Sequence, residues 1–316
     1  MGAIFVSTFN NVVPLFAVVF VGYALKRFGI LPEHLAGPMN ALCFRILFPC
    51  LCIRSMQTIT FRIEYLWLLV YMTATFLISI PILCRLVPLA VPRRGQAGVV
   101  IQAAYRSNSV SFAMPLIFNI MGEENSGPML VIVAMAAVLF NSTAVVVLNR
   151  FSETNAEASL TLRGMSREVA TNPIIVGTVI GIAIQLLPFE MPALILKPVL
   201  DLGACATPMA MLAIGLRFRF QSLAANRRPI LLASAVKLAV MPLVWTAVGF
   251  LLGFRHAVLC AIFLEHACPS ATGSVPMAEA MGCDGELAGE LVLAQTAASC
   301  VTIFCGVCIL RLLALI

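Results

Sequence analysis

The chain has 316 residues, of which 61% are hydrophobic and 11% are charged, and its mean hydropathy is +1.02. Soluble domains carry about 25% charged residues, so this composition excludes a water-soluble protein and predicts an integral membrane protein. The net charge of +6 does not indicate nucleic-acid binding, because the basic residues form short groups where membrane loops are expected rather than one stripe.

The apolar runs predict an all-α fold of ten transmembrane helices, because they are too long for the strands of a membrane barrel. The first run follows a start without basic residues, so we interpret it as a span and not as a cleaved signal peptide. In chain order the predicted spans are residues 7–25, 36–54, 65–88, 97–120, 128–149, 173–189, 193–216, 230–253, 257–281 and 287–312.

One long polar connection, residues 150–172, separates five predicted spans from the other five. The predicted organisation is therefore a first five-helix repeat over residues 1–149, a cytoplasmic linker over 150–172 and a second repeat over 173–316. Because five is odd, two similar halves would enter the bilayer with opposite orientations.

Similarity between the halves is visible at offsets of about 160 residues, and it favours an inverted repeat, which is typical of secondary transporters. The matches are Asn108 and Pro115 with Pro269 and Pro276, Met121-Gly122 with Met281-Gly282, and Pro38 and Pro49 with Pro198 and Pro208.

Basic residues are distributed unequally between the two predicted sides of the membrane. Five lie on one side: Arg54, Arg62, Lys197, Arg255 and Arg311. Twelve lie on the other: Lys26, Arg27, Arg85, Arg93, Arg94, Arg150, Arg163, Arg167, Arg217, Arg219, Arg227 and Arg228. The positive-inside rule predicts that the richer side is cytoplasmic and that both termini face out.

Spans four and nine are predicted to be broken helices that meet at a central binding site. Pro115 would free the carbonyl of Ser111, and Pro276 would free that of Thr272. Lipid does not satisfy such groups, so irregular backbone at this depth faces protein or a water-filled cavity. The predicted substrate-binding residues at the breaks are Asn108, Ser109, Ser111, Pro115, Ser270, Thr272 and Pro276. The alternative is two ordinary proline kinks patched by neighbouring hydroxyl groups.

Charged residues inside the predicted spans are the other candidates, because a charge near mid-bilayer costs roughly 2.5–3.5 kcal/mol. We expect Arg106 to face a cytoplasmic vestibule and Glu265 with His266 to face an external one, on the order of 25 Å away. A charge relay or anion attraction is the functional interpretation of these residues and of Lys237. A structural ion pair, or snorkelling of Lys237 to the interface, is the alternative.

Asn141, Gln295 and Thr296 are polar residues in spans five and ten, and they either line the central cavity or join helices. Catalysis is not predicted, because His-Glu-x-x-His and glycine-rich nucleotide motifs are absent from the sequence. The eleven cysteines lie mostly in apolar runs as small hydrophobic residues, so no metal or other cofactor is expected.

The chain resembles the auxin efflux carrier family, particularly its bacterial members, which include malonate-type transporters. The resemblance covers nearly the whole length and is carried by Pro49, Arg106-Ser-Asn108, Met114-Pro115, Leu212-Ala-Ile-Gly215, Ala267-Cys-Pro-Ser-Ala271, Pro276 and Gln295-Thr296. The family implies a dimerising scaffold from spans one, two, six and seven and a mobile transport unit from the others. It also implies that broken spans four and nine cross, with Asn108, Pro115, Ser270 and Pro276 at the crossing. The long cytoplasmic loop of the plant members is replaced here by about 23 residues, so its regulation does not transfer.

The sequence therefore predicts a secondary transporter in the cytoplasmic (inner) membrane that moves a small organic anion, either an auxin-like monocarboxylate or a malonate-like dicarboxylate. Its expected partners are this anion, the lipid bilayer and a second copy of the chain, and no nucleic acid. The alternatives are a sodium-coupled symporter of similar fold and a transporter-like membrane sensor. An intramembrane hydrolase that uses Cys268 or His266 is a further alternative.

Overall fold

The computed structural model describes residues 2–56, 64–153, 173–187, 191–216 and 226–316. These residues form helices and turns with no β-strand among them. The helices are α1 (Gly2–Arg27), α2 (Ala36–Leu42), α3 (Phe48–Met56), α4 (Glu64–Ala90), α5 (Arg94–Tyr105), α6 (Met114–Met121), α7 (Gly127–Phe151), α9 (Pro173–Gln185), α10 (Ala193–Leu216), α11 (Arg227–Ala235), α12 (Met241–Leu251), α13 (His256–Ala267), α14 (Ser274–Ala280) and α15 (Gly285–Leu312). Residues 154–172 of the predicted linker lie outside the described residues.

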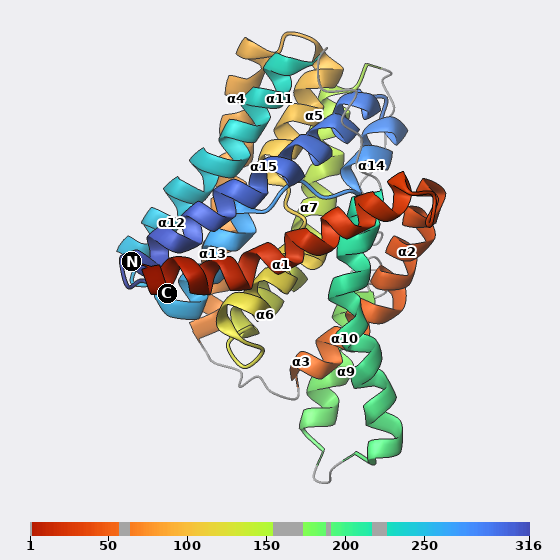
Figure 1. Ribbon diagram of the computed structural model, residues 1–316. Helices are drawn as coiled ribbons and strands as arrows, with labels where there is room; N and C mark the ends of the chain where they lie inside the picture. Colours follow the sequence, from red (N-terminus) through yellow and green to blue (C-terminus); the bar gives the residue numbers. More distant parts are fainter. Residues whose placement is uncertain (1, 57–63, 154–172, 188–190, 217–225) are drawn as a thin grey trace.

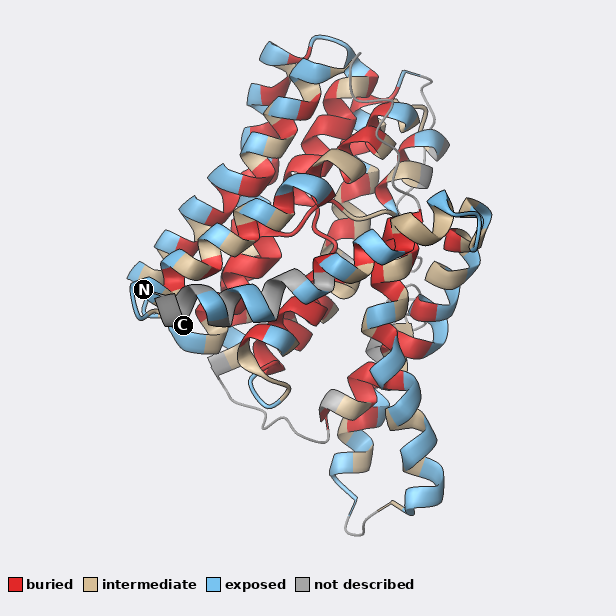
Figure 2. Ribbon diagram, in the orientation of Figure 1, coloured by how far each residue is buried: buried red, intermediate tan, exposed pale blue. Residues whose placement is uncertain are grey.

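The expected fold class is confirmed as an all-helical, multi-pass membrane protein. Among the described residues six helical stretches are long and apolar enough to cross a bilayer: Glu33–Arg54, Tyr65–Ala90, Gly127–Phe151, Ala193–Leu216, Arg227–Leu251 and Gly285–Leu312. Buried residues concentrate on the inner helices (Figure 2), while large apolar side chains such as Trp67 and Leu243 point outward, as lipid-facing residues do. The arrangement as two inverted five-helix repeats stays a prediction.

Three helical stretches contain a π-helical turn, and each turn ends two residues before a proline. The turns are Cys43–Leu47 before Pro49, Ser109–Ala113 before Pro115, and Val236–Val240 before Pro242. Proline lacks an N–H group and its ring crowds the carbonyl four residues earlier. A π-helical turn widens the preceding backbone, so these prolines are accommodated without a break.

The helices pack in two groups with α1 lying across both (Figure 1). The smaller group contains α2, α3, α9 and α10, and the larger group contains α4 to α7 and α11 to α15. Helix α1 packs along α10 and also touches α6 and α15. The contact between α1 and α10 is close because a glycine on each helix removes the side chain at the crossing. A Cβ atom on Gly215 would overlap the carbonyl oxygen of Val19 and lie 2.8 Å from the backbone nitrogen of Tyr23.

Gly215→Ala is expected to lower the free energy of unfolding by about 1–3 kcal/mol, because the added methyl group meets backbone, which must shift. The matched control is Gly289→Ala on α15, where an added Cβ atom has no neighbour within 4 Å. This control should be neutral or slightly stabilising, because alanine favours a helix over glycine. Thermal unfolding of the two purified variants in detergent checks the difference. Equal melting temperatures would contradict the close packing of α1 on α10.

Candidate functional site: the crossing of two interrupted helices

Two interrupted helices meet in the interior of the larger group. Helix α5 ends at Tyr105 and helical backbone resumes at Ser109, while α13 ends at Ala267 and α14 begins at Ser274. The two interruptions touch directly, since the backbone N–H of Asn108 donates a hydrogen bond to the carbonyl of Pro269 at 2.8 Å. Backbone groups at the two interruptions lack hydrogen-bond partners within their own helices, and this bond provides a partner for one donor and one acceptor among them.

Asn108 starts the second half of the first interrupted helix. Its Oδ1 atom accepts a hydrogen bond from the backbone nitrogen of Ser111 at 3.3 Å, which is the contact of an N-cap residue. Its carbonyl accepts hydrogen bonds from the backbone nitrogens of Phe112 and Ala113. Asn108 is therefore fixed at the start of this half-helix by hydrogen bonds to both its side chain and its backbone.

Gln295 on α15 ties the two interrupted helices together. Its Oε1 atom accepts a hydrogen bond from the backbone nitrogen of Ser270 at 2.9 Å, and its Nε2 group donates to the carbonyl of Ala103 at 3.3 Å. The side chain is fully buried. These contacts join helices and do not face the cavity described next.

A cavity of about 340 Å³ opens at the crossing, between the two groups of helices. Its polar wall includes Arg106, Asn108, Ser109, Ser111, Asn141 and Thr272 from the larger group. The facing wall comes from the smaller group and contains Asn40, Phe44 and Phe48. The cavity is thus polar on one side and largely apolar on the other.

Arg106 is the one charged side chain among the described residues that line this cavity. Its Nη2 group donates to Oδ1 of Asn141 at 2.9 Å, and its Nη1 group contacts the sulfur atom of Met277. The residue is 8% exposed. A guanidinium group held at the edge of a cavity is suited to bind a carboxylate in a two-pronged geometry.

A second polar cluster lies behind the crossing. Its charged members, Lys237 and Glu265, do not line the cavity, whereas its serines, Ser107 and Ser109, do. The Nζ group of Lys237, in a π-helical turn, donates to the carbonyl of Tyr105 at 3.3 Å and to Oγ of Ser107. Ser107 in turn donates to the carbonyl of Glu265, and Ser109 donates to Oε1 of Glu265 at 2.6 Å. The ammonium group therefore occupies the carbonyl end of α5, where the helix dipole favours positive charge.

The expected separation of Arg106 and Glu265 into opposite vestibules is wrong. Ser107, the neighbour of Arg106, bonds to Glu265 directly, and both Glu265 and His266 are fully buried. His266 lies near the rings of Phe76 and Trp245, with centroids 4.9 and 6.4 Å away, and among the described residues neither of its nitrogen atoms has a hydrogen-bond partner. The snorkelling alternative for Lys237 is wrong as well, because the side chain is fully buried.

The remaining predicted site residues lie around the cavity. Pro115 and Ser270 are buried beside the crossing, and Pro276 lies within α14. Thr296 lines a different chamber. Thr272 lines both that chamber and the crossing cavity. Sequence reasoning missed the wall formed by Asn40, Phe44 and Phe48. A polar asparagine inside an apolar run was the available signal for that wall.

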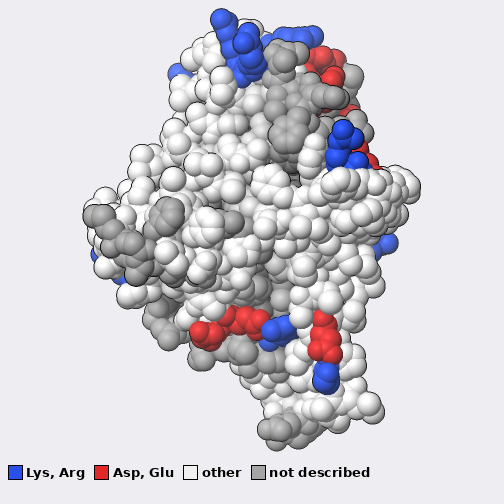
Figure 3. Space-filling model, in the orientation of Figure 1, with Lys and Arg blue, Asp and Glu red and all other residues white. Residues whose placement is uncertain are grey.

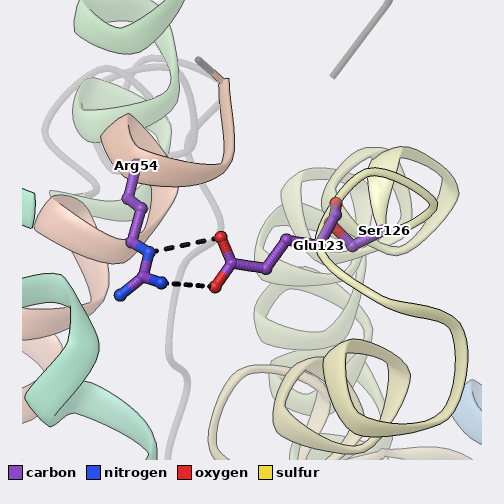
Figure 4. Close-up of polar contacts among 3 residues, drawn as sticks. All are labelled: Arg54, Glu123 and Ser126. Carbon is purple, nitrogen blue, oxygen red and sulfur yellow. Dashed lines mark hydrogen bonds and ion pairs between the residues drawn. The ribbon is translucent and has the colours of Figure 1, made fainter. Parts of the chain in front are cut away.

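An ion pair connects the smaller group to the larger group at the end of α3 (Figure 4). The Nη2 group of Arg54 lies 2.7 Å from Oε1 of Glu123, and its Nε group donates to Oε2 at 3.2 Å. Glu123 lies in the turn between α6 and α7, where its carbonyl accepts a hydrogen bond from Oγ of Ser126 at 2.6 Å. Both charged side chains are about one-third exposed, so this contact can break and re-form at little cost.

No three His, Cys, Asp or Glu side chains among the described residues are placed to hold a metal ion together.

Comparison with known proteins points to membrane transport. A family model described as "Membrane transport protein" matches residues 7–305. The chain is also similar to a protein of Methanothermobacter thermautotrophicus described as an uncharacterized transporter. The two are 24% identical over 314 residues, which cover 95% of this chain and 97% of that protein.

Proposed function

Because the chain belongs to the membrane transport protein family, which is the auxin efflux carrier family, we propose that it is a secondary transporter of a small organic anion, such as an auxin-like monocarboxylate or a malonate-like dicarboxylate. The observation that carries this proposal is the cavity at the crossing, whose lining places Arg106 beside the start of a half-helix. Anion sites in transporters with interrupted helices are built from these parts.

The anion would be held by one cationic group, one amide and several hydroxyl groups. Arg106 would bind the carboxylate, and the Nδ2 group of Asn108 would donate a further hydrogen bond, since its Oδ1 atom already caps Ser111. Ser109, Ser111 and Thr272 also line the cavity. The positive end of the dipole of the segment that begins at Ser109 adds attraction for negative charge.

Alternating access would move the larger group against the smaller one. In this proposal two inverted repeats build the fold, the smaller group with α1 forms a dimeric scaffold, and the interrupted helices carry the anion. In the described part of the chain, the interface between the groups contains the cavity and the partly exposed ion pair Arg54–Glu123, and both permit sliding. Lys and Arg gather at the end where α4 ends and α11 begins (Figure 3). We propose that this end is cytoplasmic, in the inner membrane, with both termini outside.

The test is counterflow in proteoliposomes with labelled monocarboxylates and dicarboxylates. Asn108→Ser keeps an N-cap residue but removes the amide, so we expect carboxylate affinity to fall about 10-fold, the value of one hydrogen bond of about 1.4 kcal/mol, with little change in melting temperature. The matched control is Asn119→Ser on α6. The Nδ2 group of Asn119 donates to the carbonyl of Pro115, and this residue does not line the cavity.

Three outcomes of this assay would contradict the proposal or change it. Counterflow that Asn108→Ser leaves intact would remove this residue from the site. A requirement for sodium would favour the symporter alternative. Saturable binding without counterflow would favour a membrane sensor.

A further inference from the structure

A second chamber of about 890 Å³ adjoins the crossing cavity, and its lining is acidic. Four glutamates line it: Glu33 from the turn before α2, Glu279 from α14, and Glu286 and Glu290 from α15. Thr272 lines both this chamber and the crossing cavity. An ion that reaches the crossing from this side passes these carboxylates.

Among the described residues, only part of the negative charge of the chamber's glutamates is neutralised by neighbouring positive groups. Glu33 lies 3.7 Å from the Nζ group of Lys26, while Glu290 is buried and accepts a hydrogen bond from the neutral amide of Asn226 at 2.8 Å. Within the described part of the chain, no ion pair involves Glu279 or Glu286, and both side chains are exposed. His34 also lines the chamber.

The described lining of the crossing cavity can neutralise one negative charge on a bound substrate. Arg106 is its charged lining residue, and Lys237 lies outside the lining, in the cluster with Glu265. The facing wall includes Ala41, Phe44 and Phe48. A second carboxylate on the substrate would be buried against this apolar wall without a cationic partner, which is costly.

We infer that Glu279 and Glu286, with Glu290 behind them, form a charge filter that discriminates against dianions in favour of monoanionic carboxylates. The inference rests on the proposed function and assigns it specificity residues outside the binding cavity. The free energy of an ion in a negative potential scales with its charge, so a dianion is repelled twice as strongly as a monoanion. Because exposed charges create this potential, added salt screens it.

The experiment measures counterflow of malonate and of monomethyl malonate, which differ by one negative charge at nearly the same size. Counterflow requires passage on both sides of the membrane, so the filter acts whichever way the protein inserts into the liposome. The wild type should prefer the monoanion, and the preference should shrink as ionic strength rises. In the variant Glu279→Gln/Glu286→Gln the preference at low salt should fall at least threefold and lose most of its salt dependence.

The matched control, Glu124→Gln/Asp201→Asn, also removes two negative charges, from residues that do not line the chamber, and should keep the wild-type preference. Both double variants replace exposed side chains, and unchanged melting temperatures will show that they fold. An unchanged preference in Glu279→Gln/Glu286→Gln, with both anions still transported, overturns the filter and leaves the proposed function standing. If the wild type carries neither anion, the proposed function and this inference both fall.

Discussion

Replacing Arg106 with glutamine is expected to lower the affinity for a carboxylate by about 10- to 100-fold. A hydrogen bond to a charged group contributes about 1.5–3 kcal/mol, and each 1.4 kcal/mol is a factor of ten in affinity. Arg106 is almost fully buried and is the charged lining residue of the crossing cavity, so water screens its charge weakly. Binding of a labelled carboxylate to the purified protein measures the change.

Two further variants separate binding from a structural role of Arg106. Arg106→Lys keeps the charge but loses the two-pronged geometry, and it should retain part of the affinity. Asn141→Ser removes the Oδ1 atom that Arg106 contacts and should weaken binding less than Arg106→Gln does. If Arg106→Gln binds as tightly as the wild type and unfolds at the same temperature, Arg106 has no part in the site.

The two interruptions were predictable from sequence, but their position was not. Proline and hydroxyl residues marked spans four and nine correctly, yet the break was expected at Pro115. The π-helical turn Ser109–Ala113 accommodates Pro115, and helical backbone stops earlier, after Tyr105. Arg106 therefore lies at the crossing itself. Glu265 is two residues before Ala267, where α13 ends, so it also lies close to the crossing and the expected distance between the two charges is not present.

The walls around the site are formed by tertiary contacts between helices, and these contacts cannot be read from a single sequence. The apolar wall of Phe44 and Phe48 faces the crossing because α2 and α3 pack on α10. The acidic chamber takes its glutamates from three separate segments of the chain. Polar residues inside apolar runs identify candidates, while tertiary packing decides which of them share one cavity.

Lys237→Met is expected to destabilise the protein by about 3–5 kcal/mol, the largest stability loss that we predict. Lys237 and Glu265 are both fully buried, lie within range of each other's charge and are joined through Ser107. Where two opposite charges are buried close together, removing one leaves the other uncompensated, and this costs more than replacing both. The double variant Lys237→Met/Glu265→Gln should therefore recover more than half of the lost stability.

A double-mutant cycle measured by denaturant unfolding in detergent isolates the coupling between the two side chains. The exposed pair Lys197 and Asp201 on α10, with Nζ and Oδ2 atoms 3.3 Å apart, is the matched control and should show coupling below about 0.5 kcal/mol. A double variant no more stable than Lys237→Met would mean that the two charges do not compensate each other. Lys237 would then serve only as the hydrogen-bond donor to the carbonyl end of α5, and Glu265→Gln alone should leave stability unchanged.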